Sequence, residues 1–312
     1  MTTVSVIVPI YNGQDCVEAC IEQLKNQTIS NLEVIIVDDG STDSTVEKCE
    51  NAIEGLSSFR LIKMEHAGVS AARNAGVWVA EGQYVGFVDV DDSYDNDLFE
   101  KMYNLTVLGE YDLVLFDNVG KPGETTLLSK ETALKEFFLS HISLAVWRKL
   151  FKRDLIQNIL FPEEIRIYED CYTTYKAILE SQKIICKNIT KYYYLRDTVS
   201  STRCAFTEKF FDAIRVIDDI FFDTMNQYGQ SQMASYALTK KIHVYIRIYK
   251  LFILRGQPEE CRDQAMFLRD EIIKINKSKA KIYLDSKNKY RMKMIVYCPY
   301  LFQLMINVID KN

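Results

Sequence analysis

The first hundred residues alternate short apolar runs with helix-like segments, and this alternation constrains the fold more than any other feature. The apolar runs predict strands at Val4–Val8, Glu33–Val37, Phe59–Met64 and Tyr84–Val88. Helical patterns occupy Asp15–Gln27 and Ser70–Ala80 between them. Because the strands are apolar without alternation, we expect a mostly parallel sheet with helices on both faces. Ligands of such sheets bind beyond the carboxyl ends of the strands.

Later segments change in character. Two more strands are expected at Tyr111–Phe116 and Lys183–Cys186, with a mixed stretch around Trp147. From about Phe206 onward the pattern is helical, and three helices are expected at Phe206–Gly229, Ala234–Gly256 and Pro258–Ile275. We therefore predict two domains, residues 1–206 and 207–312. A capping box at Ser44–Glu47 is expected to open the helix after the second strand.

The charge distribution limits the partners. A net charge of -5 argues against nucleic acid, which calls for a concentrated basic surface. From Lys274 to Lys293, however, eight lysines and arginines face a single acid, Asp285, and the apolar run Met294–Ile309 follows. Two interpretations of this tail stay open: peripheral attachment to an anionic membrane, and a helical cap that packs on the catalytic domain or in a homodimer.

Cysteine spacing and the first residues bear on the compartment. The eight cysteines are scattered without a C-x-x-C pair, so we expect reduced thiols in the cytoplasm, with the protein on the inner face of the plasma membrane if the tail binds lipid. The start lacks the features of a signal peptide, and no segment reaches 18 uninterrupted apolar residues. We expect no membrane-spanning helix.

Polar residues gather where the strands end. Asp89–Asp92 follows the fourth strand, and neighbouring carboxylates of this kind often bind Mg²⁺ or Mn²⁺. In Asp38–Ser41, an Asp suits a pyrimidine N3–H or a ribose hydroxyl, and Gly40 would let backbone approach the ligand. The stretch Ala67–Gly76 places Arg73 on a helix of small residues, where it could meet a base or phosphate. Taken singly, each motif is also compatible with an acidic turn, a helix cap or a packed helix.

Together these motifs resemble a known family. They are VSVIVPIYN, EVIIVDDGSTDST, AGVSAARNAG and GQYVGFVDVDD, in this order and spacing, and the chain is similar to the N-terminal half of family 2 glycosyltransferases. Later segments, VWRKLFKRDL, FPEEIRIYEDCYTTYKAI and YYYLRDTVSSTR, also resemble that family, so the likeness covers roughly Thr3–Arg203. It implies the GT-A fold, a mixed, mostly parallel α/β sheet flanked by helices, here with an all-helical C-terminal extension.

The resemblance implies a role for each matching residue. Pro9, Tyr11 and Asn12 would flank the nucleoside, with Gly40 in the same nucleotide-binding loop. Asp39 would contact the base, supported by Arg73. Asp89 would lie near the ribose, and Asp91 would bind the Mn²⁺ or Mg²⁺ that bridges the donor diphosphate. Asp170 matches the catalytic base, although its place at a helix start would also suit a carboxylate favoured by the helix dipole. The family commonly has Ser at the position of Val90, a side chain that need not bind the metal.

The chemistry fits this assignment. One base and one electrophile suffice for a single displacement at an anomeric carbon, so inversion is expected. The implied donor is a nucleoside diphosphate sugar, most often UDP-linked, and the implied acceptor is a cell-surface glycan that can be lipid-linked. Four aromatic residues, Trp147, Tyr192, Tyr193 and Tyr194, are candidates for a sugar-stacking platform, or are core residues. Lys149 and Arg196 are candidates for phosphate or acceptor contacts. The three histidines, His66, His141 and His243, are interpreted as ordinary polar residues.

Two other functions could be carried by an α/β sheet of this kind. A sugar-nucleotide pyrophosphorylase would carry a glycine-rich basic loop after the first strand, and Pro9–Gly13 has no basic residue. A non-catalytic module could bind nucleotide or glycan on the same fold. The retained carboxylates Asp89, Asp91 and Asp170 favour an enzyme.

Overall fold

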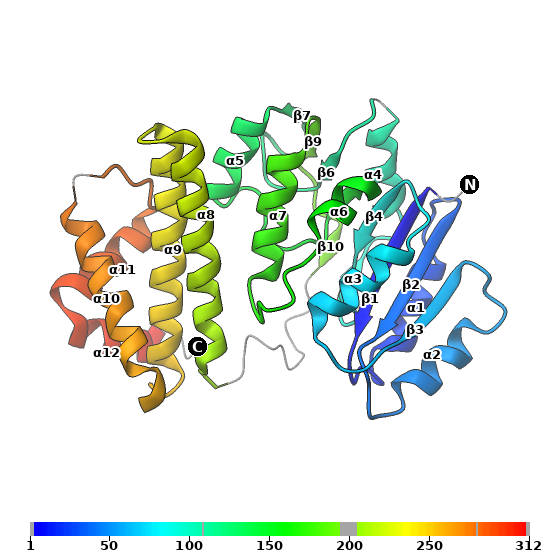
Figure 1. Ribbon diagram of the computed structural model, residues 1–312, viewed down its shortest axis with the longest axis horizontal. Helices are drawn as coiled ribbons and strands as arrows, with labels where there is room; N and C mark the ends of the chain where they lie inside the picture. Colours follow the sequence, from blue (N-terminus) through cyan, green and yellow to red (C-terminus); the bar gives the residue numbers. More distant parts are fainter. Residues whose placement is uncertain (1–2, 108, 194–204, 279, 310–312) are drawn as a thin grey trace. The chain divides into compact units, whose positions relative to one another are not determined.

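The computed structural model describes residues 3–107, 109–193, 205–278 and 280–309 (Figure 1). Their contacts define two compact units. The first holds the described residues up to 193, apart from Phe138–Ser140 and Arg166–Tyr168, and the second holds those two short segments and the described residues from 205 onward. The domain limits 1–206 and 207–312 stay predictions.

A mixed sheet forms the centre of the first unit. Its strand order is β3-β2-β1-β4-β8-β6-β9-β7. The strands are β1 (Val4–Ile10), β2 (Leu32–Asp38), β3 (Phe59–Lys63), β4 (Tyr84–Phe87), β6 (Leu113–Leu115), β7 (Thr125–Leu128), β8 (Lys149–Lys152) and β9 (Ile184–Lys187). The first four are parallel to their neighbours among themselves, β8 is antiparallel to β4 and β6, β9 is parallel to β6, and β7 is antiparallel to β9. The predicted α/β class and mostly parallel N-terminal half are confirmed.

Helices cover both faces of this sheet. They are α1 (Val17–Lys25), α2 (Thr45–Ile53), α3 (Val69–Val79), α4 (Leu98–Thr106), α5 (Lys130–Phe138), α6 (Arg153–Ile159) and α7 (Glu169–Glu180). Alternate residues of β1 from Val4 to Ile10 pack in one apolar core with α1, α2 and α4. On the other face Ile7 meets α3 at Gly76, where a Cβ would lie 2.6 Å from an Ile7 methyl carbon. Gly76 therefore permits α3 to lie close to the sheet.

The predicted capping box is wrong, although its helix exists. Helix α2 begins at Thr45 with Ser44 as its N-cap, but the Ser44 side chain accepts no cap hydrogen bond. Its ψ of 13° lies outside the extended region that a capping serine adopts. Instead, Oδ1 of Asp43 accepts a hydrogen bond from the Thr45 amide at 3.0 Å. The carboxylate one residue earlier thus replaces the serine hydroxyl.

Strands β7 and β8 of the large sheet and a second, small sheet are not predicted by the sequence and complete the first unit. Strand β8 lies in the mixed stretch around Trp147 and is inserted between β4 and β6. A second, two-stranded sheet pairs β5 (Ser93–Tyr94) with β10 (Tyr192–Tyr193) in antiparallel fashion. This pairing brings Tyr192, far along the chain, next to the segment that follows β4.

The second unit is helical where it is described. It contains η1 (Glu208–Phe211), α8 (Asp212–Tyr228), α9 (Gln232–Leu254), η2 (Glu259–Cys261), α10 (Arg262–Lys277), α11 (Ser286–Tyr297) and α12 (Pro299–Ile309). Figure 1 shows α8 and α9 side by side, and they share an apolar core with α10, α11 and α12. The three predicted helices correspond to α8, α9 and α10. None of the described helices combines the length and apolar composition that crossing a bilayer requires.

Candidate active site

Polar side chains meet at one edge of the sheet. Strands β1, β2 and β4 are parallel, with β1 between the other two, so their carboxyl ends lie together. Tyr11 and Asn12 follow β1, Asp39 follows β2, and Asp89 and Asp91 follow β4. This is the edge at which ligands of such sheets bind.

The turn after β1 is fastened to the loop after β2. Asn12 has a left-handed φ of 49°; its amide donates to Ser41 Oγ at 2.9 Å, and its Oδ1 accepts from the Thr42 amide at 2.8 Å. Pro9 is buried within β1 opposite Val37, because the strand runs on to Ile10 rather than ending before the proline. Any contribution of Pro9 to a ligand site would act through the position of this turn.

Asp39 is a nearly buried carboxylate that holds the loop before α3. Oδ1 accepts from the Ala67 amide at 2.8 Å, and Oδ2 accepts from the Gly68 amide at 3.0 Å. Gly40 has a φ of +76°, and a Cβ there would lie 2.8 Å from the His66 backbone nitrogen. Gly40 therefore permits the His66 backbone to pack closely against it, and the approach of its own backbone to a ligand stays a prediction.

His66 contacts Tyr11 and Asp39, so its interpretation as an ordinary polar residue is incomplete. Its ring stacks on Tyr11 with centroids 4.3 Å apart and an interplanar angle of 28°. Its Nδ1 lies 2.9 Å from Asp39 Oδ2. The signal that could have drawn attention to it is its position directly before the AGVSAARNAG motif. Tyr11, Asp39 and His66 thus form one cluster, called here the base cluster.

Arg73 brings together carboxylates from two elements. Its Nη1 donates to Glu169 Oε1 at 2.9 Å and to Asp170 Oδ1 at 2.7 Å, and its Nη2 donates to Asp89 Oδ1 at 3.2 Å. The Arg73 side chain is only 4% exposed. Burial alone would lower the pKa of its guanidinium, but the charges of Asp170, Asp89 and Glu169 raise it instead. We call Arg73, Asp89, Glu169 and Asp170 the acid cluster.

Asp170 is a largely buried carboxylate with a raised pKa. It opens helix α7, as the sequence predicted, and its side chain is 19% exposed. Burial, with the neighbouring charge of Glu169, raises its pKa to about 6, although Arg73 opposes this. Oδ1 accepts a hydrogen bond from Arg73, and Oδ2 accepts a longer one of 3.4 Å from the Val146 amide. A carboxylate with a pKa near working pH suits a general base.

The pair Asp89 and Asp91 has the chemistry of a divalent-cation site. Burial, followed by the charges of Asp170 and Asp91, raises the pKa of Asp89 against the opposing effect of Arg73. A cation would relieve that repulsion. In the described part of the chain, no three His, Cys, Asp or Glu side chains are grouped to hold a metal. Mg²⁺ and Mn²⁺ often bind through one or two carboxylates plus substrate phosphates, so this donor set fits a cation shared with a diphosphate.

Two of the candidates for sugar or phosphate contacts, Tyr192 and Lys149, are buried. Tyr192 is 3% exposed, stacks on Trp147 at 4.6 Å, and accepts a hydrogen bond from the Asp89 amide at 3.0 Å, so it is a core residue. Tyr193 is exposed, whereas Tyr194 and Arg196 lie outside the described residues. The buried ammonium of Lys149 donates to Asp117 Oδ2 and to the carbonyls of Ser143 and Ala145. Its three donors are used within the protein, so its expected ligand contact is wrong.

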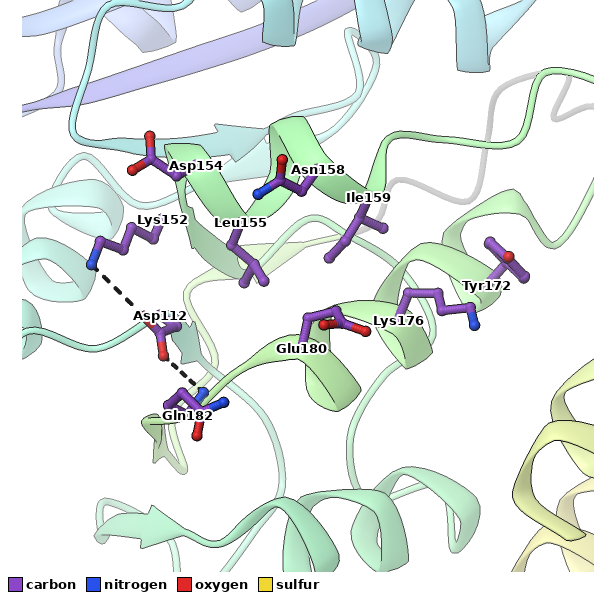
Figure 2. Close-up of a pocket in the computed structure, with 10 residues that line it drawn as sticks. All are labelled: Asp112, Lys152, Asp154, Leu155, Asn158, Ile159, Tyr172, Lys176, Glu180 and Gln182. Atoms are coloured by element: carbon purple, nitrogen blue, oxygen red, sulfur yellow. Dashed lines mark hydrogen bonds and ion pairs between the residues drawn. The ribbon is translucent and has the colours of Figure 1, made fainter. Parts of the chain in front are cut away.

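A separate pocket of about 520 Å³ lies beside α6 and α7 (Figure 2). It contains none of the predicted site residues. Oδ2 of Asp112, one of its lining residues, accepts hydrogen bonds from the amides of Gln182 and Lys183 at 2.8 and 3.0 Å. Lys152 lies 3.9 Å from the other Asp112 oxygen. Because this carboxylate serves the protein itself, the convergent groups at the sheet edge make the stronger site.

Comparison with known sequences gives consistent matches. The family model described as Glycosyl transferase family 2 matches residues 5–179. "Putative glycosyltransferase EpsH" of Bacillus subtilis is 30% identical over 226 residues, 67% of this chain and 65% of that protein. "Poly(ribitol-phosphate) beta-glucosyltransferase" of Bacillus spizizenii is 31% identical over 202 residues, 62% of this chain. The matched stretches span 65% and 32% of the lengths of these two relatives.

Solved structures agree on the fold. The crystal structure of S. aureus TarS residues 1–349 in complex with UDP-GlcNAc matches with a TM-score of 0.70 and 21% identity, over 98% of this chain and 89% of that one. The expected GT-A architecture, with its helical C-terminal part, is thereby confirmed. The family model matches residues 5–179, which is more than half of the sequence and extends from β1 into α7. The chain therefore belongs to glycosyl transferase family 2.

Proposed function

We propose that this protein transfers a sugar from a nucleoside diphosphate donor, most simply a UDP-sugar, to a hydroxyl of a cell-surface glycan with inversion at the anomeric carbon. The observation that carries the proposal is the acid cluster. Arg73 holds Asp170, a base with a pKa of about 6, on the same guanidinium as Asp89 of the proposed metal pair. The proposed proton acceptor, Asp170, therefore lies next to the proposed diphosphate site at Asp89.

The base cluster supports a nucleotide donor. Tyr11 is 47% exposed and offers a ring on which a base can stack, and Asp39 offers carboxylate oxygens to a ring N–H. TarS, whose fold this chain shares, was crystallised with UDP-GlcNAc. Uracil presents an N3–H of the required kind, so UDP is the first donor nucleotide to test. Thymidine diphosphate presents the same group.

Asp91, with Asp89 beside it, would hold the divalent cation. A bound Mn²⁺ or Mg²⁺ would supply positive charge to the diphosphate as that group leaves. The chain's own part is to supply two acceptor-only carboxylates at the end of β4 and to balance Asp89 with Arg73. Metal dependence is therefore part of the proposal.

The reaction is written as one displacement. The acceptor oxygen bonds to the anomeric carbon while the bond from that carbon to the diphosphate oxygen breaks. The electron pair leaves with the diphosphate, and the acceptor proton passes to Asp170. Arg73 holds both Glu169 and Asp170, and Asp170, whose pKa is raised to about 6, is the carboxylate proposed to act. One base suffices for a single displacement, so no covalent glycosyl–enzyme step is required.

A donor and acceptor screen tests the proposal. The purified protein is incubated with Mn²⁺, individual nucleotide sugars and glycan acceptors that include poly(ribitol phosphate), the polymer named for one relative. Release of nucleoside diphosphate that depends on the acceptor is expected for one donor. Proton NMR of the product should show an anomeric configuration opposite to that of the donor. Retention would refute the single displacement, and no release with any pair would refute the transferase proposal.

The tail is proposed to bind the inner membrane surface through one face of α11. Lys289, Tyr290, Lys293 and Tyr297 are exposed on this helix, whereas Met292 and Ile295 are buried in the core of the second unit. The buried face packs within the second unit, so the exposed face is the one left to meet a membrane or a second subunit. Exposed lysines alternating with tyrosines suit an anionic lipid surface. Cytoplasmic location and a homodimer stay predictions.

Flotation with anionic liposomes at low salt tests this attachment. Each basic residue near such a surface contributes about 1 kcal/mol, so Lys289→Glu/Lys293→Glu should weaken binding at least about tenfold. Lys121→Glu/Lys183→Glu, at exposed positions of the first unit, is the matched control and should bind normally. Equal flotation of both variants, or none by the unmodified protein, would contradict membrane attachment. A second subunit on this face would instead appear as a change of mass in light scattering.

A further inference from the structure

The His66 ring has two contacts, and both involve residues of the base cluster. It stacks on Tyr11 at a centroid distance of 4.3 Å, and its Nδ1 lies 2.9 Å from Asp39 Oδ2 and 3.0 Å from the Asp39 carbonyl oxygen. Both of these oxygens are acceptors only. Nδ1 must therefore carry a proton and donate it.

These two contacts are the ones that the proposed function gives to the donor's base. A uracil ring would stack on Tyr11 and donate its N3–H to the Asp39 carboxylate, whereas His66 now stacks there, with Nδ1 2.9 Å from Asp39 Oδ2 and hydrogen-bonded to the Asp39 carbonyl oxygen. Aromatic rings in contact are separated by about 3.5–4 Å, so a base between Tyr11 and His66 would need about 7 Å or more. At 4.3 Å the two rings leave no room for it.

The His66 side chain can leave without disturbing the loop that carries it. Its backbone is fixed, because Gly40 packs against the His66 nitrogen and Asp39 holds the next two amides, those of Ala67 and Gly68. The side chain, in contrast, is 58% exposed. Rotation about its first side-chain torsion would free the Tyr11 face and take the imidazole away from Asp39 Oδ2, which keeps its hydrogen bond from the Gly68 amide.

We infer that His66 is an internal competitor for the donor's base, which must displace the imidazole from Tyr11 and Asp39 to bind. This inference rests on the proposed function, since it takes the base cluster as the nucleotide site. The apparent affinity for nucleotide is then the intrinsic affinity reduced by the fraction of molecules in which His66 has moved away. The diphosphate portion of the donor, which meets other residues, is unaffected by this competition.

Calorimetric titration of full-length protein with UDP and with inorganic pyrophosphate, both with Mn²⁺, tests the inference. One exposed hydrogen bond and one exposed stack should hold the site closed by a modest factor, so His66→Ala should tighten UDP binding about 3–10-fold. Pyrophosphate affinity should not change. His141→Ala is the matched control, because His141 is also an exposed histidine paired with a carboxylate, that of Glu136. It should leave both affinities unchanged.

An NMR measurement follows the ring itself. The chain has three histidines, so the Cε1–H resonance of His66 can be assigned by its loss in His66→Ala. It should shift when UDP is added, as the ring leaves the Tyr11 face, and stay in place with pyrophosphate. Equal or weaker UDP binding by His66→Ala, or an unmoved resonance at saturating UDP, would overturn the inference alone. If neither protein binds UDP or thymidine diphosphate, the proposed function itself fails, and the inference with it.

Discussion

Two buried charge clusters of the first unit differ in their balance of charge. In the acid cluster one cation, Arg73, faces three carboxylates at 2.7–3.2 Å. Around Asp117 the ratio is reversed, since Arg148 and Lys149 both pair with this single carboxylate at 3.0 and 3.3 Å. Asp117 and Lys149 are almost fully buried, and the remaining donors of Lys149 meet backbone carbonyls.

The difference supports the proposal that the acid cluster is the reactive one and that the cluster around Asp117 is structural. Around Asp117 the carboxylate accepts hydrogen bonds from both cations, so both positive charges have a partner within the protein. In the acid cluster, burial and surplus negative charge raise the pKa of both Asp89 and Asp170. Groups displaced from their ordinary pKa by a fold are costly to keep and are found at functional sites. The contrast supports the proposed catalytic role of Asp170 and a structural role for Asp117.

The largest expected effect comes from replacing each aspartate by its amide. Asp170→Asn should lower the transfer rate about 10²–10⁴-fold, because the amide cannot accept the acceptor's proton. Affinity for UDP with Mn²⁺ should remain nearly intact. Asp117→Asn should instead destabilise the fold by about 3–5 kcal/mol, because it leaves buried cations without their partner. Steady-state rates, calorimetric affinities and urea melts of both variants measure this contrast.

Glu169→Gln is the matched control for Asp170→Asn. Glu169 binds the same Nη1 of Arg73 and sits one residue away, so its variant removes a similar contact without removing the proposed base. We expect it to keep most of the transfer rate. If Asp170→Asn were fully active, Asp170 would leave the mechanism, and Glu169 would become the candidate base.

Removal of the metal ligand should have the next largest effect. Asp91→Ala should lower kcat/KM for the donor on the order of 100-fold, because the cation that offsets diphosphate charge is worth several kcal/mol. UDP titrations with and without Mn²⁺ should show that the metal-dependent gain in affinity is lost. Asp43→Ala, which removes a carboxylate at the start of α2, should keep that gain. Full wild-type activity in excess chelator would contradict metal dependence altogether.

The pH dependence should follow Asp170. Its pKa of about 6 is raised above the ordinary carboxyl value, so the base is protonated below pH 6 and ionised above it. The transfer rate should therefore fall about tenfold for each pH unit below this value and level off above it. Rates from pH 4.5 to 8 at saturating substrates and Mn²⁺ measure the profile. A flat profile down to pH 5 would separate Asp170 from the proton transfer.

The smallest expected effect is at Asp39. Asp39→Ala should raise the donor KM roughly tenfold and change kcat less, because it removes the acceptor for the base but no group at the anomeric carbon. A lower melting temperature is also expected, since Asp39 supports the amides of Ala67 and Gly68. Measurement below the melting range separates the two effects. A fall in kcat with an unchanged KM would place Asp39 outside base recognition.

Local sequence determined the strands and the residues at their ends. Apolar runs of five residues followed by Asp39 or by Asp89 and Asp91 predict buried parallel strands with carboxylates at one edge, and neighbouring parallel strands necessarily bring these ends together. The helix that opens at Asp170 was also visible from its pattern. These features depend on residues close in the chain, so spacing alone revealed them, and the motif order identified the family.

Tertiary structure decided which of these residues act on one another. Arg73 and Asp170 are 97 positions apart, and no local pattern indicates that one guanidinium holds both Asp170 and Asp89. The same holds for His66 against Tyr11, and for the burial of Tyr192 and Lys149, which had been candidates for ligand contact. Exposure and partner choice arise from how α3, α7 and the sheet pack. A side chain's type therefore predicts what chemistry it can perform. Packing decides whether that side chain contacts a ligand or another group of the protein.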